Sequence, residues 1–244
     1  MKLTIAGCGD AFGTGGRFNT CFHVSASPGN FLIDCGASSL VALARQALDP
    51  NAIDTIFITH LHGDHFGGLP FFVLQGWYAS GRETKLTIAG PAGIEKRVWD
   101  TFELLFPGAA CKKSRFKIEF VELPANDTLS INGIRVTSFA VRHFSGAPSL
   151  ALRFETDGKV ISFSGDTEWT DKLIPASAEA DLYLQECYTF TSHYKFHSSH
   201  AELVEKLSAS TAKRIILTHF SNEMLDHRDE AKWECSYDGM VIEL

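Results

Sequence analysis

His60-Leu61-His62-Gly63-Asp64-His65 places four potential metal ligands on six consecutive residues. The apolar run from Asp54 to Thr59 precedes it and has the composition of a buried strand. A helix-like segment from about Gly68 to Ala79 follows, so we expect the ligands on a strand-to-helix loop in which Gly63 allows a tight turn. Imidazole nitrogens and carboxylate oxygens together suit borderline divalent ions such as zinc, manganese or iron. The stretch therefore predicts a metal site at the end of a strand.

Three later residues repeat this arrangement. His143, Asp166 and His219 each follow a short apolar run that has the pattern of a strand. Any one of them alone is compatible with an ordinary polar loop. If the strands share one edge of a sheet, however, their loops bring these side chains into one cleft. The predicted metal ligands are then His60, His62, Asp64, His65, His143, Asp166 and His219.

The rest of the chain is rich in strand-like runs, with a few helices between them. Strands are expected at Lys2 to Gly7, Cys21 to Ser25, Asn30 to Asp34, Lys85 to Ala89, Lys117 to Leu123, Ile134 to Val141, Leu150 to Glu155, Val160 to Ser164, Leu182 to Gln185 and Arg214 to Thr218, and further helices at Ser38 to Leu48, Gly93 to Leu105 and His200 to Ser208. This order does not fit simple strand–helix alternation. It predicts an α/β (α+β) fold in which two sheets pack face to face under outer helices. No linker-like segment divides residues 1–244, so we expect one domain.

Composition narrows the class of protein. An apolar share of 45% with 21% charged residues is typical of a chain that builds its own core. The net charge of −7 argues against a globally basic nucleic-acid coat protein. A basic run at Lys112, Lys113, Arg115 and Lys117 could attract a polyanion, but such runs are more often a solvated face.

The sequence also bears on location. The chain has no apolar run long enough to span a bilayer, and its N-terminus has the pattern of a strand and not of a cleavable signal. The cysteines are scattered, without metal-binding or disulfide-framework spacing, at Cys8, Cys21, Cys35, Cys111, Cys187 and Cys235. We therefore expect buried, reduced thiols, a cytoplasmic protein and no membrane partner.

The motif resembles that of the metallo-β-lactamase superfamily. Its H-x-H-x-D-H pattern is complete at His60 to His65, and the later single His, the Gly165-Asp166-Thr167 turn and Thr218-His219 come in the order of that family. Asp34-Cys35-Gly36 at the end of an early strand is similar as well. The resemblance runs from about Lys2 to Phe220, and it implies a four-layer αββα sandwich.

The resemblance also implies how the ligands divide. His60, His62 and His143 would hold one ion, Asp64, His65 and His219 the other, and Asp166 would bridge them. We expect two divalent ions, zinc by default, with manganese or iron as alternatives. Two such cations can share a hydroxide nucleophile and stabilise charge on the group it attacks, which predicts a metal-dependent hydrolase.

Local motifs resemble the ribonuclease Z-like and cyclic-nucleotide phosphodiesterase branch. The segment from Gly13 to Thr20 is similar to the N-terminal loop of that branch, and Glu186 with His197-Ser198-Ser199 resembles its Glu and Gly-His-Ser-Thr elements. Phe196 stands where glycine is usual. By this match Asp64, His197 and Glu186 are catalytic, with His197 as phosphate clamp or general acid oriented by Glu186. Alternatively, His197 is one of several solvated histidines and Glu186 forms an ordinary salt bridge.

The substrate is open to several interpretations. The transfer-RNA processing enzymes of this branch carry a long Gly/Pro-rich arm, commonly between the third His and the bridging Asp, whereas only a short strand pair joins His143 to Asp166. This favours a small phosphodiester or a short nucleic acid. A thioester or lactone hydrolase would use the same metals without the Glu186 and His197 pair. A di-iron oxidoreductase would need an added flavin domain, and a non-enzymatic metal-binding scaffold typically loses ligands. Relatives of this kind often form homodimers, and we expect the same.

Overall fold

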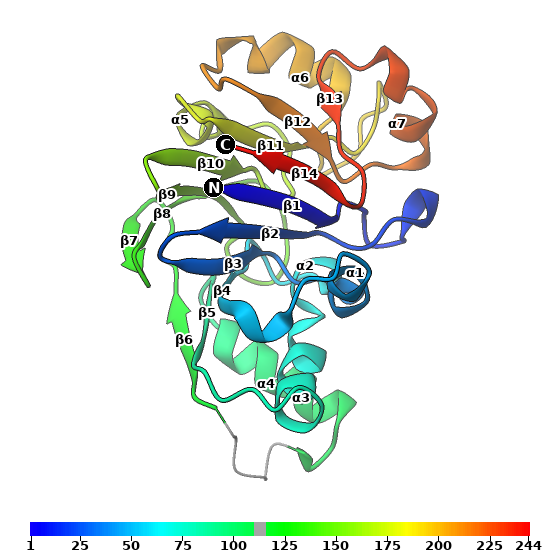
Figure 1. Ribbon diagram of the computed structural model, residues 1–244. Coiled ribbons are helices and arrows are strands. Elements are labelled where there is room, and N and C mark those ends of the chain that lie inside the picture. Colours follow the sequence, from blue (N-terminus) through cyan, green and yellow to red (C-terminus); the bar gives the residue numbers. More distant parts are fainter. Residues whose placement is uncertain (110–115) are drawn as a thin grey trace.

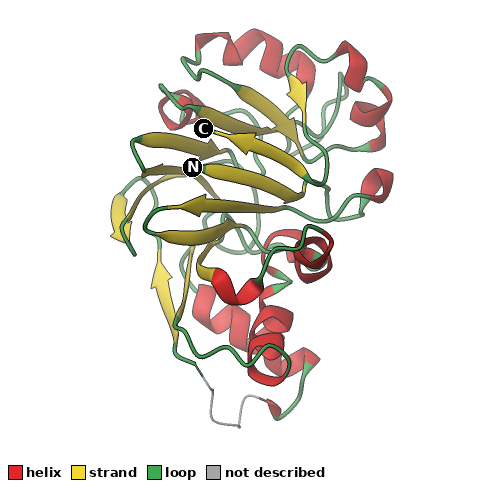
Figure 2. Cartoon of the chain, viewed as in Figure 1, coloured by secondary structure: helices red, strands yellow, loops and turns green. Residues whose placement is uncertain are grey.

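The computed structural model describes residues 1–109 and 116–244, and it contains two seven-stranded sheets that pack face to face. Helices cover the outer face of each sheet (Figure 1), and colouring by secondary structure shows the same layers (Figure 2). The strand order is β14-β1-β2-β3-β4-β5-β6 in the first sheet and β13-β12-β11-β10-β9-β8-β7 in the second. The expected αββα sandwich of the metallo-β-lactamase fold is confirmed.

The element bounds are as follows. The first sheet contains β1 (Lys2–Gly7), β2 (Cys21–Ala26), β3 (Gly29–Ile33), β4 (Ile53–Phe57), β5 (Leu86–Gly90), β6 (Ile118–Glu122) and β14 (Met240–Glu243). The second contains β7 (Thr128–Ile131), β8 (Ile134–Ala140), β9 (Leu150–Thr156), β10 (Lys159–Phe163), β11 (Leu182–Glu186), β12 (Ile215–Thr218) and β13 (Glu234–Cys235). The α-helices are α1 (Ser39–Arg45), α2 (Gly63–Phe66), α3 (Leu69–Tyr78), α4 (Ile94–Leu105), α5 (Leu173–Ser177), α6 (His200–Lys206) and α7 (Asn222–Asp226). Short 3-10 turns are η1 (Thr14–Gly16), η2 (Pro50–Ala52), η4 (Leu207–Ala209) and η5 (Arg228–Glu230).

Aromatic side chains join the two sheets. Phe154 of β9 lies with its ring centroid 5.4 Å from that of Phe31 on β3 and 5.0 Å from that of Phe57 on β4. Phe22 of β2 meets Phe163 of β10 edge to face at 5.1 Å. All five rings are fully buried. Burial of each such side chain contributes about 1.5–3 kcal/mol, so this layer fixes how the sheets sit on one another.

Each outer layer has its own apolar contact with a sheet. Ile94, Val98 and Phe102 of α4 recur at helical spacing and are buried against the first sheet, beside Trp77 of α3. Leu203 of α6 belongs, together with the short helix α7, to the cluster on the outer face of the second sheet. These layers bury the strands on both faces, which explains their nearly continuous apolar composition.

Strand direction determines where the polar loops meet. In the first sheet β3, β4, β5 and β6 are parallel, and in the second β10, β11 and β12 are parallel. β8 is antiparallel to β9, which is antiparallel to β10, so β8 and β10 run in the same direction. The carboxyl ends of β4, β8, β10, β11 and β12 therefore carry the loops that bring polar side chains together.

Several elements were not predicted. The edge strands β7, β13 and β14 and the short helices α5 and α7 have too few residues for a clear period, and β14 pairs with β1 through Lys2 opposite Glu243. The cysteines among the described residues are free thiols, and most are buried. Cys111 and the basic residues Lys112, Lys113 and Arg115 lie outside the described residues. Within the described ranges, no helix combines the length and the apolar character that crossing a bilayer requires.

Candidate metal centre

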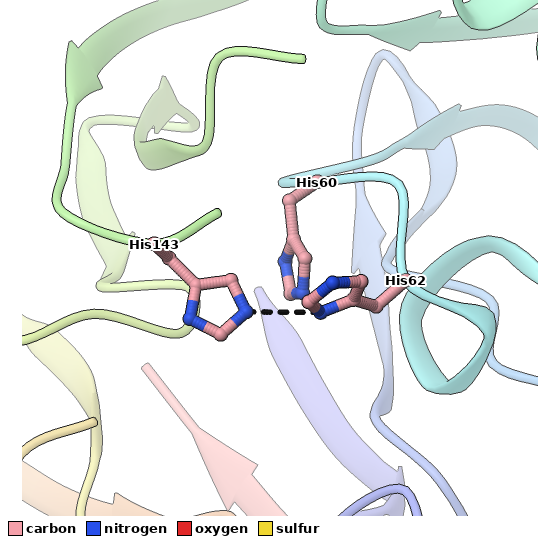
Figure 3. A group of neighbouring side chains, drawn as sticks. All are labelled: His60, His62 and His143. Atoms are coloured by element: carbon pink, nitrogen blue, oxygen red, sulfur yellow. Dashed lines mark hydrogen bonds between the residues drawn. The ribbon is translucent and has the colours of Figure 1, made fainter. Parts of the chain in front are cut away.

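Three histidines form the first group of ligands (Figure 3). His60 and His62 follow β4, and His143 follows β8 from the opposite sheet. Nε2 of His143 lies 2.9 Å from Nδ1 of His62, and the His60 and His143 ring centroids are 4.7 Å apart. Side chains separated by about eighty residues thus converge on one point, as the strand-end argument predicts.

The second group contains Asp64, His65, Asp166 and His219, all of them buried. Nε2 of His65 lies 3.4 Å from Oδ2 of Asp64 and 3.3 Å from Oδ1 of Asp166. Nε2 of His219 lies 3.2 Å from Oδ2 of Asp166 and 3.8 Å from Oδ2 of Asp64. Imidazole and carboxylate atoms therefore surround a second position.

Asp166 faces both groups. Its Oδ2 lies 3.8 Å from Nε2 of His60 and 3.9 Å from Nε2 of His143, while the same carboxylate contacts the second group as described. The seven predicted ligands therefore lie together, with Asp166 between the two groups. This arrangement matches the ligand division that the family resemblance implies, and it remains a prediction until metal binding is measured.

Unsatisfied polar atoms test whether a metal fits. Among the described residues, His60 Nε2, His65 Nε2 and Asp166 Oδ1 are buried side-chain atoms without a hydrogen-bond partner, since the 3.3 Å approach of the last two lacks hydrogen-bond geometry. Leaving a buried polar atom unpaired costs about 1–3 kcal/mol. All three atoms point into the ligand groups, so divalent cations there would satisfy them, and the donor set fits zinc, manganese or iron.

The local backbone differs from the expected loop. Asp64 and His65 lie in the one-turn helix α2, and only His60 and His62 are in the loop before it. The role expected for Gly63 is wrong, because its backbone is helical and a Cβ there would meet nothing within 4 Å. The glycine that the site needs is Gly36, where a Cβ would lie 2.1 Å from the carbonyl oxygen of Asp64. Close packing of two backbones, and not a tight turn, positions the motif.

Asp34 orients His65 from behind. Its Oδ2 accepts a hydrogen bond from Nδ1 of His65 at 2.7 Å. Thr59 donates to the same carboxylate through its backbone N–H and through its hydroxyl, both at 2.8 Å. A carboxylate on Nδ1 fixes the histidine tautomer so that Nε2 can bind a metal. This explains physically why the Asp34-Cys35-Gly36 segment belongs with the ligands.

The other histidines are held in a similar way. Nδ1 of His60 lies 3.1 Å from the Thr59 hydroxyl, and Nδ1 of His143 donates to the carbonyl oxygen of Phe196 at 2.9 Å. Phe196, the departure from the usual glycine, has φ 69°, a left-handed conformation that disfavours side chains. Its N–H donates to Oε1 of Glu168 at 2.7 Å. The chain keeps the backbone geometry of glycine at this position in spite of the phenylalanine.

His197 and Glu186 form a pair next to the first group. Nδ1 of His197 lies 2.5 Å from Oε1 of Glu186, which is buried at the end of β11. The backbone N–H of Ser198 donates to Oε2 of Glu186 at 2.8 Å. The His197 ring centroid lies 5.0 Å from that of His143, whereas His193 is exposed and His200 stacks on Phe190 away from the ligands. Of the three neighbouring histidines, His197 is therefore the one placed at the site.

Charge is distributed unevenly among the ligand residues. Burial lowers the pKa of His143 to about 4, which favours the neutral imidazole that a metal needs. Burial opposes charge on Asp166, yet His219 and His65 hold the pKa of that carboxyl well below its ordinary value. Burial also opposes charge on His65, but Asp166 and Asp64 raise the pKa of that imidazole well above its ordinary value.

A cleft opens onto the ligands. It measures about 120 Å³ and is lined by five predicted site residues, His62, Asp64, Asp166, His197 and His219. Five further lining residues were not predicted from the sequence, namely Asp10, Ala11, Phe12, Tyr188 and Tyr194. These five residues lie on two loops without strand or helix periodicity, so no pattern in the sequence could have identified them. Their proximity to the motifs at 13–20 and 197–199 was the only available signal.

The two-sheet sandwich and its strand-end ligands define a metal-binding hydrolase of the metallo-β-lactamase fold. A family model described as "Anti-Pycsar protein Apyc1" matches residues 1–236. The chain therefore belongs to this family.

Further relatives are ribonucleases Z. The enzyme of Macrococcus caseolyticus is 25% identical over 79% of this chain and 78% of its own length, and that of Geobacillus kaustophilus is 27% identical over the same shares. The crystal structure of human tRNase Z, short form, superimposes with a TM-score of 0.81 at 26% identity and covers 100% of this chain and 99% of that one. The metallo-β-lactamase fold protein YhfI of Bacillus subtilis has a TM-score of 0.81 at 22% identity, with coverage of 100% and 99%, which shows the shared fold.

These comparisons confirm three expectations drawn from the sequence. The chain is a member of the metallo-β-lactamase superfamily, it is ribonuclease Z-like, and it is a metal-dependent hydrolase of the class that cleaves phosphodiester bonds. Divalent metal binding agrees with the ligand groups.

Proposed function

We propose that the protein is a phosphodiesterase with two metal ions that acts on small phosphodiesters, such as cyclic nucleotides or short oligonucleotides. The observation that carries the proposal is the pair of His197 and Glu186 at the edge of the seven-ligand cluster. Phosphodiester cleavage needs both a metal centre and a group that protonates the leaving oxygen, and this cleft offers both.

The metals would be held as two groups. His60, His62 and His143 suit one ion, and the Asp64, His65 and His219 set suits the other, with Asp166 between them. We propose zinc for both, with manganese or iron as alternatives, because the nitrogen and oxygen donors accept all three. When bound, two such ions would make water a stronger nucleophile and stabilise negative charge on phosphate oxygens. Asp64 is proposed to be catalytic through this ligand role.

His197 is proposed to supply the proton. Glu186 accepts the hydrogen bond from Nδ1, which leaves Nε2 as the atom that can serve a substrate in the cleft. Burial opposes charge on His197, yet Glu186 raises the pKa of the imidazole to about 9, so the ring carries its proton at neutral pH. Burial in turn raises the pKa of Glu186 to about 7, against the effect of His197. A protonated imidazole fixed by a buried carboxylate can hold a phosphate oxygen and protonate the leaving group.

The size of the substrate follows from the loops. Between His143 and Asp166 the chain contains only the hairpin of β9 and β10, joined by the turn at Asp157 and Gly158. An arm for a folded RNA has no place in that segment. The cleft of about 120 Å³ is also smaller than the pockets that enclose drug-sized ligands, which are about 300–1,000 Å³. Both features favour a small phosphodiester over a transfer-RNA precursor.

Three further expectations are retained as parts of the proposal. We propose that residues 1–244 act as one domain, since one core layer joins both sheets. We also propose a homodimer and a cytoplasmic location. Size-exclusion chromatography with light scattering would test the dimer, and a monomer at micromolar concentration would contradict it.

The test is turnover of bis(p-nitrophenyl) phosphate after metal removal and readdition of zinc or manganese, with the metal content measured beforehand. We expect metal-dependent release of nitrophenol at two ions per chain. Asp181→Asn serves as a control, because this carboxylate precedes β11 at the end remote from the ligands, where it accepts from the Val160 N–H and pairs with Lys213. If the loaded protein cleaves a lactone or thioester but no phosphodiester, the carbonyl-hydrolase alternative replaces the proposal. Two bound ions with no turnover of any ester would favour the scaffold alternative.

A further inference from the structure

The backbone of Phe196 links a proposed metal ligand to the proposed proton donor. Its carbonyl oxygen accepts from Nδ1 of His143 at 2.9 Å, and the next residue along the chain is His197. Its N–H donates to Oε1 of Glu168 at 2.7 Å. Glu168 therefore holds the residue on which the positions of both histidines depend.

Glu168 is itself held in place. Its backbone N–H donates to the carbonyl oxygen of Arg142 at 3.1 Å, and the Arg142 N–H donates to the hydroxyl of Thr167 at 3.0 Å. The carbonyl oxygen of Thr167 also accepts from the Ser198 hydroxyl at 2.7 Å. The turn formed by Thr167 and Glu168 is thus bonded to both histidine-bearing loops, so the fold fixes the backbone that presents the carboxylate.

The conformation of Phe196 requires such a partner. Its φ of 69° lies in the left-handed region, which a residue with a side chain occupies only where the surrounding structure fixes it. A hydrogen bond to a carboxylate is roughly twice as strong as one between neutral groups. Without Glu168, we expect Phe196 to move to a negative φ and its carbonyl oxygen to turn away from His143.

Both histidines are sensitive to such a movement. While Nδ1 of His143 donates to Phe196, Nε2 stays free of a proton and faces the first ligand group, 2.9 Å from Nδ1 of His62 (Figure 3). Loss of the acceptor allows the proton to move to Nε2, the atom that a metal needs. Side-chain atoms of His143, Asp166 and His197 lie within 4.8 Å of one another, so a shift of the Phe196 peptide also displaces the proton donor from the centre.

We infer that Glu168 is a positioning residue, which holds His143 and His197 in place together through the backbone of Phe196. The inference rests on the proposed function for the part that concerns His197, whereas the part that concerns His143 requires metal binding alone. Removal of this one acceptor should therefore weaken metal binding and proton donation together, although the acceptor acts on both through a third residue.

The first test is metal affinity, measured by competition with a chelator of known affinity. Glu168→Leu keeps the approximate size of the side chain but removes the acceptor. We expect it to weaken the ion of the first group by about 10- to 100-fold, the usual effect of changing the partner behind a metal-bound histidine, and to leave the other ion bound as before. Glu168→Gln keeps an acceptor oxygen and should retain most of the affinity. Circular dichroism verifies the fold, and Glu168→Ala replaces the leucine variant if that variant does not fold.

Glu223→Leu is the matched control. Oε1 of Glu223 accepts from the backbone N–H of Thr191 at 2.8 Å and from that of Ser192 at 3.0 Å, on the same loop between β11 and α6 that contains Phe196. The control removes the same kind of carboxylate contact from this loop but leaves the Phe196 peptide untouched, so metal affinity should stay at the parent value. An equal loss in Glu223→Leu and Glu168→Leu would show that general loosening of the loop is responsible, and the inference would be wrong.

The tautomer of His143 gives a readout that needs neither metal nor substrate. Long-range proton–nitrogen correlation spectra of the metal-free protein show which ring nitrogen carries the proton. We expect the proton on Nδ1 in the parent protein and in Glu168→Gln, as the contact with Phe196 requires, and a mixture of both tautomers in Glu168→Leu. A proton confined to Nδ1 in Glu168→Leu as well would overturn the inference.

A double variant tests whether Glu168 acts through the left-handed backbone. Glycine adopts positive φ about as readily as negative φ, so Phe196→Gly should reduce the need for the carboxylate. We expect Glu168→Leu to lower metal affinity by a smaller factor in the Phe196→Gly background than in the parent protein. The same factor in both backgrounds would show that Glu168 acts by another route and would contradict the inference.

Kinetics separates this inference from the proposed function. At saturating metal, Glu168→Leu should slow phosphodiesters with poor leaving groups more than those with good ones, which is also the pattern expected of His197→Ala. If the parent protein hydrolyses no phosphodiester, the proposed function fails, while the metal affinities and the His143 tautomer still decide the inference. If the parent hydrolyses phosphodiesters and Glu168→Leu matches it in affinity, tautomer and kinetics, the inference alone is overturned.

Discussion

Asp34→Asn tests whether the carboxylate behind His65 controls the metal centre. Oδ2 of Asp34 accepts from Nδ1 of His65 at 2.7 Å, whereas Nε2 of the same ring faces Asp166 at 3.3 Å. Asparagine keeps the shape and the acceptor for the Thr59 N–H, but it turns an NH₂ group towards Nδ1. The ring then accepts at Nδ1 and carries its proton on Nε2, the atom that a metal needs.

The expected loss of metal affinity follows from the position of this one proton. Changing the partner of a metal-bound histidine typically weakens metal affinity by about 10- to 100-fold, which corresponds to about 1.4–2.8 kcal/mol. The loss should fall on the ion held by Asp64, His65 and His219, while the group of three histidines keeps its own ion. Competition with a chelator of known affinity, followed by metal analysis, resolves the two binding constants.

The control is Asp181→Asn, which also replaces a partly buried carboxylate that accepts from a backbone N–H, but at the end of the sheet remote from the ligands. Circular dichroism of each variant verifies that the fold is intact before metals are titrated. If Asp34→Asn binds both ions within a factor of two of the parent protein, the tautomer argument is refuted and Asp34 has only a structural role.

Three further changes test other parts of the centre. Asp166→Ala should lower the metal content and abolish hydrolysis together, because this carboxylate faces both ligand groups. Metal analysis and turnover of bis(p-nitrophenyl) phosphate measure the two effects. Full activity of the variant would contradict the two-ion site. Phe196→Gly should raise the free energy of unfolding of the metal-free protein by up to about 1 kcal/mol in urea titrations. The reason is that glycine removes the energetic cost of the left-handed φ of 69°, and this gain exceeds the cost of the larger chain entropy that glycine adds to the unfolded state. A loss of stability would show that the phenylalanine ring is needed for packing. His197→Ala should slow substrates with poor leaving groups more than those with good ones, and equal losses would argue against an acid role. In the parent protein, activity with poor leaving groups should fall as pH rises through about 9, where His197 loses its proton, and this decline should be absent from the variant.

The ligands could be predicted from the sequence because His60, His143, Asp166 and His219 come just after apolar strands, and His62, Asp64 and His65 stand beside His60 in one short motif. A buried strand has a recognisable composition, and a polar residue at its exit has few structural reasons to be there. The convergence of His143, Asp166 and His219 then required only that their strands run in the same direction, which the second sheet bears out. His60 joins them from the first sheet. The αββα layers followed from the same strand-rich order.

The parts that the sequence did not reveal depend on contacts between distant segments. The edge strand β14 is only four residues long and is specified by its pairing with β1. Phe12 and Tyr194 lie on loops whose shape is set by Asp10 and Glu223, through hydrogen bonds that have no sequence period. Gly63 was given a role because it stands inside the motif, whereas the close contact falls on Gly36, which is remote from the motif in sequence.

Backbone strain links these features. Residues other than glycine rarely adopt positive φ, yet Asp34, Phe196 and His219 do so at 60°, 69° and 67°. Asp34 orients His65, the carbonyl of Phe196 accepts from His143, and His219 is itself a ligand. Each such residue costs of order 1–3 kcal/mol, and it persists only where the surrounding structure fixes it. The fold therefore holds the ligand histidines in place at the cost of an unfavourable backbone conformation at these three residues. Phe196 is the one of the three whose side chain takes no part in the centre. Relief of its strain should therefore stabilise the chain without removing a ligand.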